Sequence, residues 1–512
     1  MRKHCAIWIF GMLLCAMIGA SAQDDQTAPA ENAAQGAQQE QRPASGDSQP
    51  VPMSENPPLS GMDLPSLEPH AAPLSYLQPG ATVSESADSN AANGLGGGSF
   101  SSVTRGLGSL SLRRLWKNYD LGIDYVGGVG YYSQQGIGTK LLQQMDLNQK
   151  ITWKRGQLTV RDNFSYLPEG NFGGSYGSLG SQGVDSLGGT PFTALLGGSV
   201  LGTLGLVPRI LNVSVAEFSE YLTPKSAVTA TGGYAFTHFY GSDPVTGGTF
   251  IGVSQVSAQG GYNRVLTPHT QVAVVYAYQG FDFSVVGSKF HVHVVQGMYG
   301  HRVSGRMDLL LGAGPQFTSF NLPCSLVDVL VGNPHCSQNQ AGAVVGSVPT
   351  SRIGVAAQGR LRYRFPKTSL DLSFERFETS GSGLFAGAES NIAKMTAERS
   401  LSRVWSGLAD IGFARVSRIQ PLSLAQEATC GGAGQGPCPG INANSYTYGF
   451  IGAGLHRAFG RNFHGFLSYQ FNELEFDHSY CGGVPECSRL SNRQVVTIGL
   501  DWTPRPIRID WF

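Results

Sequence analysis

The chain has 512 residues and no formal net charge, and only 14% of its residues are charged. A soluble domain would ordinarily carry about 25% charged residues. The balanced charge argues against a nucleic-acid partner. The low charge, together with 69 Gly and 10% aromatic residues, favours strands that face lipid on one side and a polar interior on the other.

The N-terminus has the features of a secretory signal peptide. Arg2 and Lys3 precede an apolar stretch over residues 6–18, and the small-x-small triplet Ala20-Ser21-Ala22 follows. This pattern predicts a signal peptide over residues 1–22. Acylation of Cys15 is the alternative, but a leucine stands where a small residue is expected. No later run reaches the roughly 18 uncharged apolar residues of a membrane helix, so a membrane span must consist of strands.

Residues 23–98 are rich in Pro, Ala, Gln and Ser and carry ten acidic residues against the single basic Arg42. Such a segment buries too little apolar area to offset the entropy of ordering it, so we expect a disordered acidic arm in the periplasm. The arm would act as a spacer, or would tether the protein to a periplasmic or cell-wall partner. Residues 99–117 form a connector that no pattern assigns.

From residue 118 onward, apolar and polar residues alternate with a period of two. The first such strand has Tyr119, Tyr125 and Val129 on one face and Asp120 and Asp124 on the other. The strands near residues 157–166 and 355–365 alternate in the same way. We expect the apolar faces to meet lipid and the polar faces to line a lumen.

Short turns and longer loops follow one another in regular alternation. Seven short turns lie near residues 154–156, 223–224, 267–268, 303–305, 365–367, 401–403 and 459–461. With eight longer loops between and around them, they predict an all-β fold over residues 118–512, a transmembrane antiparallel up-and-down barrel of about sixteen strands. Both ends of this barrel would lie on the short-turn, periplasmic side. A β-propeller is the alternative, but its connections need not alternate in length.

Six cysteines remain after the signal peptide, and they fall into three close pairs. Each pair lies within one predicted loop: Cys324 with Cys336, Cys430 with Cys438, and Cys481 with Cys487. In an oxidising compartment these spacings predict three local disulfides that pin exposed loops. Zinc is the alternative, but the pairs lack CxxC spacing and lie on separate loops.

Over residues 118–512 the chain resembles bacterial outer-membrane porins. The resemblance rests on the alternating strands, on strand-end aromatic residues such as Trp153, Trp405 and Trp502, and on the terminal Phe512. It implies contact with outer-membrane lipids and lipopolysaccharide, insertion by the barrel-assembly machinery, and a homo-trimer as one assembly to test. Which C-terminal aromatic residue that machinery would read stays open, because a tail with two prolines separates Trp502 from Phe512.

The loop at residues 168–208 holds two features of a pore constriction. Residues 168–174, PEGNFGG, resemble the PEFGG segment of the constricting loop of general porins, which would place Glu169 and Phe172 at the constriction. The match has two inserted residues and follows the third predicted strand, not the fifth. The uncharged run 192–207 would find cover in the lumen, at a subunit interface or on the barrel rim.

Charged residues at polar strand positions are candidates for lining the lumen. They are Arg360, Arg362 and Arg364, which face Asp371 and Glu375 across a short turn, together with Lys150 and Arg161. These charges would form the wall of a permeation path, or a ladder of ion pairs that braces the barrel. His291 and His293 share one strand face, but a third metal ligand is not evident. We therefore expect no metal and no cofactor.

The predicted function is a porin-like channel for passive diffusion of small polar solutes, because barrels of this size leave an aqueous lumen. No local cluster of Ser/His or Asp/His residues indicates an enzyme. The arm is too short for the plug domain of a 22-stranded transporter. Two alternatives remain: an anchor or surface-interaction barrel without transport, and an export pore that works with a periplasmic partner.

Overall fold

The computed structural model describes residues 57–61, 75–91, 98, 100–134, 138–167, 209–240, 250–283, 288–324, 329–339, 344–381, 383–419, 443–481 and 488–509. The predicted signal peptide lies outside these residues, as do the constriction candidates Glu169 and Phe172 and the run 192–207. No helix among the described residues is long and apolar enough to cross a membrane.

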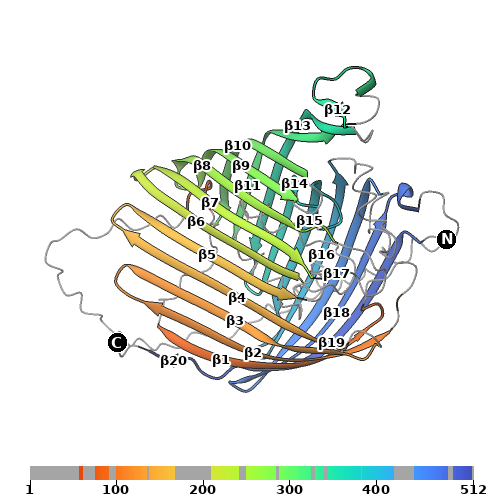
Figure 1. Cartoon of the computed structure of the whole chain (residues 1–512). Helices are drawn as coiled ribbons and strands as arrows, with labels where there is room; N and C mark the ends of the chain where they lie inside the picture. Colours follow the sequence, from red (N-terminus) through yellow and green to blue (C-terminus); the bar gives the residue numbers. More distant parts are fainter. Residues whose placement is uncertain are drawn as a thin grey trace. The chain divides into compact units, whose positions relative to one another are not determined.

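The chain folds as a closed antiparallel β-barrel (Figure 1). Of the twenty strands among the described residues, β12 (Cys336–Gln338) and β20 (Ile507–Arg508) are very short, and the other eighteen form the barrel wall. These are β1 (Tyr76–Asp88), β2 (Ser101–Leu115), β3 (Tyr119–Tyr132), β4 (Gly138–Trp153), β5 (Gly156–Leu167), β6 (Arg209–Thr223), β7 (Ser226–Phe239), β8 (Val253–Thr267), β9 (Thr270–Phe283), β10 (Ser288–Ser304), β11 (Met307–Pro323), β13 (Val344–Arg364), β14 (Thr368–Thr379), β15 (Ala388–Ser400), β16 (Trp405–Arg418), β17 (Ser445–Phe459), β18 (Phe463–Phe476) and β19 (Leu490–Trp502).

Each barrel strand pairs with its neighbours in sequence, and the last strand, β19, pairs with the first, β1. The closing register runs from Ala81 opposite Trp502 to Asp88 opposite Val495. Every backbone hydrogen-bonding edge of the sheet is therefore paired, which a strand-built structure requires in order to cross a membrane.

The all-β antiparallel barrel is confirmed, but its strand number is eighteen and not sixteen. All seven predicted short turns connect consecutive strands, and an eighth lies at residues 116–118, between β2 and β3. The two additional strands are β1 and β2. They come from the C-terminal part of the predicted arm and from the connector at residues 99–117.

The wall therefore begins at Tyr76, and the arm boundary predicted at residue 98 is wrong. The composition of this segment predicted disorder, because the side chains at outward positions of β1 are small. Examples are Pro79, Ala81 and Val83. Thirteen residue pairs with β2 and eight with β19 supply the stability that its composition lacks. Estimates from composition count only the apolar area of the segment itself and miss such pairing.

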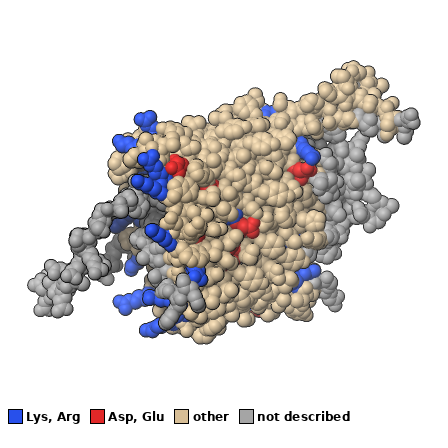
Figure 2. Space-filling view, turned by 60° about the vertical axis from the view of Figure 1, so that its left-hand side comes forward, with Lys and Arg blue, Asp and Glu red and all other residues tan. Residues whose placement is uncertain are grey.

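The two faces of the wall differ as the alternation predicts. Large apolar residues are exposed on the outer face, for example Ile353, Phe413 and Ile498 at 74%, 53% and 62%. Their neighbours in the strands point inward and are mostly buried. Figure 2 shows a broad outer surface on which most of the visible Lys and Arg lie along one edge. A largely apolar outer surface of this kind is the lipid-facing surface of a membrane barrel.

The short-turn end of the barrel is basic. Seven of the eight short turns hold exposed Lys or Arg, the eighth holds an exposed His269, and none of them holds Asp or Glu. The Lys and Arg residues are Lys117, Lys154, Arg155, Lys225, Arg306, Lys367, Arg403 and Arg461. Short turns lie on the periplasmic side in barrels of this type, so we assign this basic rim to the periplasm.

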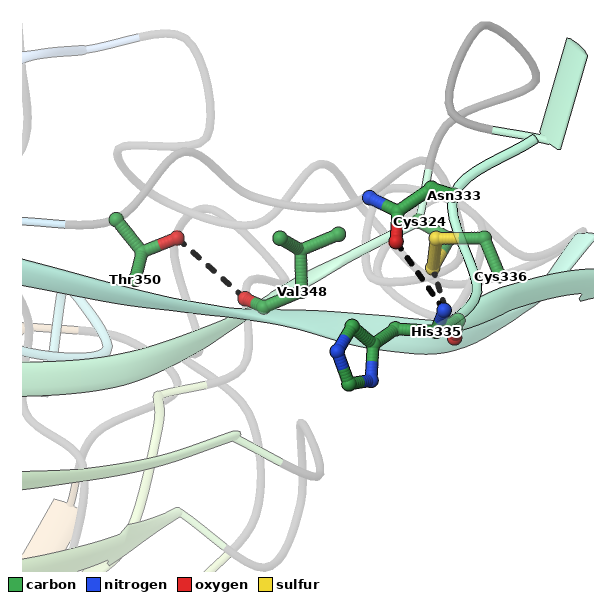
Figure 3. Close-up of a disulfide and its surroundings, with 6 residues drawn as sticks. All are labelled: Cys324, Asn333, His335, Cys336, Val348 and Thr350. Carbon is green, nitrogen blue, oxygen red and sulfur yellow. Dashed lines mark hydrogen bonds between the residues drawn. A yellow bond between two sulfur atoms is a disulfide. The ribbon is translucent and has the colours of Figure 1, made fainter. Parts of the chain in front are cut away.

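At the other end, one hairpin extends beyond the wall. It consists of β12 and the first residues of β13, and a disulfide between Cys324 and Cys336 closes it, with the two Cα atoms 5.7 Å apart (Figure 3). The amide of His335 donates a hydrogen bond to Asn333 Oδ1 over 3.1 Å beside this bridge. This pair of the three predicted is confirmed. Cys430, Cys438 and Cys487 lie outside the described residues, and nothing is described of the Cys481 side chain.

Candidate functional site

The inner wall carries an ion-pair network across three strands. On β13, Arg360 Nε donates to the two carboxylate oxygens of Asp371 on β14, at 3.1 and 2.8 Å. Two residues further along the same face, Arg362 Nε donates to Asp308 Oδ1 on β11, at 3.0 Å. These four side chains are between 13% and 30% exposed. The network thus ties β11, β13 and β14 together and also presents charge to the lumen.

The register alone would have paired these residues differently. Asp371 lies directly opposite Arg362 in the β13–β14 ladder, yet it binds Arg360, and Arg362 turns to Asp308. Asp308 is not among the predicted lumen residues, because its partner strand, β13, follows a long loop whose length does not set the register. In the sequence, the only indication of Asp308 was its acidic side chain just after a short turn, at an inward-facing position of the strand.

The other candidate lumen residues also lie on inward-facing positions. Lys150 is opposite Thr159, and Arg161 is opposite Asn148, in the β4–β5 ladder. Buried Gln157, Thr159 and Asn163 share their face. Arg364 and Glu375 extend the inward rows of β13 and β14. The structure therefore places each of these candidates on the inner wall, and it brings Arg360, Arg362 and Asp371 into the ion-pair network.

The loop between β14 and β15 folds inward, although the sequence patterns did not predict a constriction there. Its residues Leu384, Phe385 and Ala386 are 2%, 1% and 5% exposed. Phe385 packs 5.6 Å from Tyr446 of β17, measured between ring centroids. Ala386 joins a buried group from the β8–β13 side of the wall, whereas Leu384 and Phe385 join one from the β15–β18 side. The loop thus bridges two parts of the barrel wall.

Together these side chains form what we call the outer cluster, an apolar group at the loop end of the lumen. It consists of Phe250, Leu384, Phe385, Ala388, Ala414, Val416, Ala443, Tyr446, Tyr448, Phe450, Leu474 and Phe476, with Phe239, Ile392 and Tyr480 packed against it. Because these residues fill space inside the wall, they narrow the lumen at the end opposite the basic rim.

Glycines allow the loop to enter the lumen. Gly381, Gly383 and Gly387 have φ angles of +82°, +79° and +92°, a region that residues with a Cβ rarely adopt. A Cβ at Gly383 would lie 2.7 Å from the Phe239 ring, and one at Gly387 would lie 2.6 Å from the Phe290 ring. The sequence signal was the run Ser380–Gly387, SGSGLFAG, in which glycines flank an apolar triplet.

Backbone hydrogen bonds hold the loop in this position. The amide of Ile251 donates to the Gly383 carbonyl over 2.8 Å, and the amide of Ile419 donates to the Gly387 carbonyl over 3.2 Å. Ile251 precedes β8 and Ile419 follows β16, so residues far apart in sequence anchor the loop. These bonds satisfy polar backbone groups that would otherwise be buried unpaired.

A cavity of about 590 Å³ with both polar and apolar residues in its lining lies at the short-turn end, on the side of β1, β2 and β15–β19. Its inward-facing lining includes Thr82, Glu398, His456, His464 and Asp501. Thr82 Oγ1 donates to Asp501 Oδ1 over 2.7 Å across the closing strands. The short-turn end of the barrel therefore holds a cavity with polar and charged residues in its lining, whereas the loop end holds the apolar outer cluster.

His291 and His293 lie on the outer face, away from the lumen. Each bonds through Nδ1 to a tyrosine hydroxyl of β9, His291 to Tyr278 at 2.9 Å and His293 to Tyr276 at 2.8 Å. Within the described ranges, no group of three His, Cys, Asp or Glu residues is placed to hold a metal ion.

The backbone is similar to those of solved outer-membrane proteins, at low sequence identity. OccK2 (OpdF) of Pseudomonas aeruginosa is 9% identical, with 83% of this chain and 98% of that chain covered and a TM-score of 0.37. OccAB3 of Acinetobacter baumannii is 8% identical, with coverages of 84% and 99% and a TM-score of 0.37. The ferric-catecholate import receptor Fiu of E. coli K12 is 7% identical, with coverages of 83% and 81% and a TM-score of 0.39. No family model and no curated protein sequence matches the chain.

These similarities are distant, so the strand pairing and the surface of the chain itself define the architecture. A closed barrel with an apolar outer belt and a polar inner wall is an integral protein of the bacterial outer membrane.

Proposed function

We propose that the chain is an outer-membrane channel through which small polar solutes diffuse, and that the loop 380–387 is its constriction. The main support is the number of barrel strands together with the inner wall. Barrels of 16–18 strands enclose an aqueous channel unless a segment blocks it. Here the wall presents charged pairs, and a cavity of about 590 Å³ that charged side chains help to line lies on the periplasmic side.

The outer cluster gives the channel a defined narrow point. Solutes that enter from outside would have to pass Phe385 and its neighbours, so the inward loop would limit both the size and the rate of passage. Three glycines and two anchoring hydrogen bonds hold the loop, and neither anchoring bond belongs to the strand ladder.

Planar-bilayer conductance of the refolded full chain tests this function, together with swelling of liposomes in sugars of increasing mass. We expect conductance steps that are smaller than the barrel diameter would allow, and swelling only with the smallest sugars. A folded barrel that shows neither conductance nor swelling as the natural sequence, as a Phe385→Ala variant and as a variant lacking residues 23–61 would contradict the channel.

A second candidate, a barrel without transport that anchors or displays its loops, has one observation in its favour. The outer cluster fills the loop end of the lumen with residues that are mostly below 10% exposed. If this packing is permanent, the barrel serves as a scaffold for structures such as the disulfide-closed hairpin. The same measurements separate the two functions.

A further inference from the structure

A short piece of the arm lies inside the barrel. Residues 57–61, Pro-Pro-Leu-Ser-Gly, precede β1, yet Leu59 is 4% exposed and Ser60 is fully buried. The Leu59 side chain packs in a pocket of inward-facing residues from three neighbouring strands, Ala273, Val275, Met298 and Leu310. This part of the predicted disordered arm is therefore held on the inner wall.

The wall binds the backbone of this segment. The Leu59 amide donates to Asn263 Oδ1 over 3.1 Å. The Ser60 carbonyl accepts from Thr229 Oγ1 at 3.0 Å and from Gln259 Nε2 at 2.9 Å. All three wall residues are buried and point inward from β7 and β8. The wall therefore supplies an acceptor for a peptide N–H, two donors for a peptide C=O and an apolar pocket for a side chain. Together these are the elements that recognise a peptide.

The wall is also shaped to receive the segment. A Cβ at Gly300 would lie 2.8 Å from Leu59 Cδ2, and a Cβ at Gly261 would lie 2.4 Å from Ser60 Cβ. Both distances are shorter than real carbon contacts, so glycine at these two wall positions makes room for the arm. Leu59 also borders a small cavity together with Asp308, Arg360 and Arg362. The segment thus lies beside the ion-pair network, within the proposed path.

We propose that the inner wall of β7–β11 is a binding site for a short peptide, with a pocket for an aliphatic side chain, and that residues 57–61 occupy it as a removable plug. This inference rests on the proposed channel, because a plug needs a pore to close. The basic rim supports it independently. Residues 23–75, which precede the wall, carry eight acidic residues against the single basic Arg42, and opposite charges would keep this segment near the basic rim at the short-turn end of the lumen.

The first test locks the arm in place in the full chain. In a Leu59→Cys/Gly300→Cys variant, we expect oxidation to form a disulfide, identified by mass spectrometry of the digest. The oxidised channel should stay at its lowest conductance, and reduction should raise it. A Leu59→Cys variant alone is the matched control and should not respond to reduction. A disulfide that forms without any change in conductance would overturn the plug, and failure to form it would overturn the placement of the segment.

The second test does not depend on conductance. A Leu59→Asp variant should release its own arm and bind a fluorescent peptide of sequence PPLSG, measured by anisotropy in detergent. The peptide PPDSG should bind at least about tenfold more weakly, because it loses the buried leucine. Equal binding of the two peptides, or no binding, would overturn the site. If the natural sequence, Phe385→Ala and Leu59→Asp all fail to conduct, the channel fails, while trapping and peptide binding still decide the site.

Discussion

Arg493 on the last barrel strand and Asp88 on the first form a buried ion pair that closes the barrel. Arg493 Nε donates to the two carboxylate oxygens of Asp88 at 3.1 and 2.9 Å, across 405 residues of sequence. The side chains are 7% and 0% exposed. The same strands also share hydrogen bonds through Ser86 and Thr497. Polar contacts therefore fasten the seam between β1 and β19 from inside the lumen.

We expect Arg493→Leu to destabilise the barrel by about 3–5 kcal/mol, because it leaves the Asp88 carboxylate buried and unpaired. Urea unfolding in lipid vesicles, followed by tryptophan fluorescence, measures this change. The double variant Asp88→Leu/Arg493→Leu is the matched control and should recover most of the loss, because no isolated charge remains. Equal destabilisation by the single and the double variant would show that the pair does not act as a unit.

Phe385→Ala should raise single-channel conductance, because it removes a buried ring of the inward loop that packs against Tyr446 in the outer cluster. Phe413→Ala is the matched control, since that ring is 53% exposed on the outer face. We expect Phe413→Ala to leave conductance unchanged. If both variants are folded and conduct alike, Phe385 does not contribute to the constriction.

The two interpretations of the ion-pair network predict different outcomes for Asp371→Asn. If the network lines the permeation path, loss of this carboxylate leaves Arg360 unbalanced, and the reversal potential in a salt gradient should shift toward anion selectivity. Arg360→Gln should shift it toward cations. If the network only braces the wall, both variants should lose about 1–3 kcal/mol of stability with no change in selectivity.

Asp477, between β18 and the short helix η3 (His478–Cys481), should make the loop end of the barrel sensitive to acid. Burial acts to raise the pKa of Asp477, but hydrogen bonds from the Ser479 side chain and from the amides of Asn444, Ser445 and Ser479 outweigh it and lower the pKa. Its ionised form therefore stabilises the fold. This contribution is fully present above the ordinary pKa of 3.8 and is lost as the pH falls through the lowered value.

Thermal unfolding of the natural sequence and of Asp477→Asn between pH 7 and pH 2 tests this expectation. Above the ordinary pKa of Asp477, the natural sequence should unfold at a higher temperature than Asp477→Asn, by a constant difference. Below that pH the difference in unfolding temperature should shrink. A difference that stays the same down to the lowest pH would show that the carboxylate charge is not what stabilises this loop.

Replacement of both hairpin cysteines, Cys324→Ser/Cys336→Ser, should leave the barrel folded. The disulfide closes a loop of 12 residues, for which the stabilisation is about 3 kcal/mol at most, and the hairpin extends beyond the strand ladder. Heat-resistant mobility in gels should persist, while proteolysis within residues 324–346 becomes faster. Loss of heat-resistant mobility would show that the hairpin contributes to the wall.

The sequence by itself determined the barrel and most of its hairpins. The two-residue alternation of strands such as β5 and the Pro and Gly residues of the short turns are local signals, and each acts within one strand or one reversal. The inward positions of Lys150, Arg161 and the arginines of β13 follow from the same alternation. Local patterns of this kind hold wherever one face of a strand meets lipid.

The tertiary structure decided what fills and closes the barrel. The strand β1, the plug at Leu59, the inward loop around Phe385 and the pairing of Arg362 with Asp308 all depend on partners far away in sequence. None of these segments has a strong pattern of its own, because the energy that orders it comes from surfaces that exist only once the wall has closed. A polar, glycine-rich or alanine-rich stretch then becomes ordered, since the barrel supplies the hydrogen bonds and the apolar contacts that the stretch lacks.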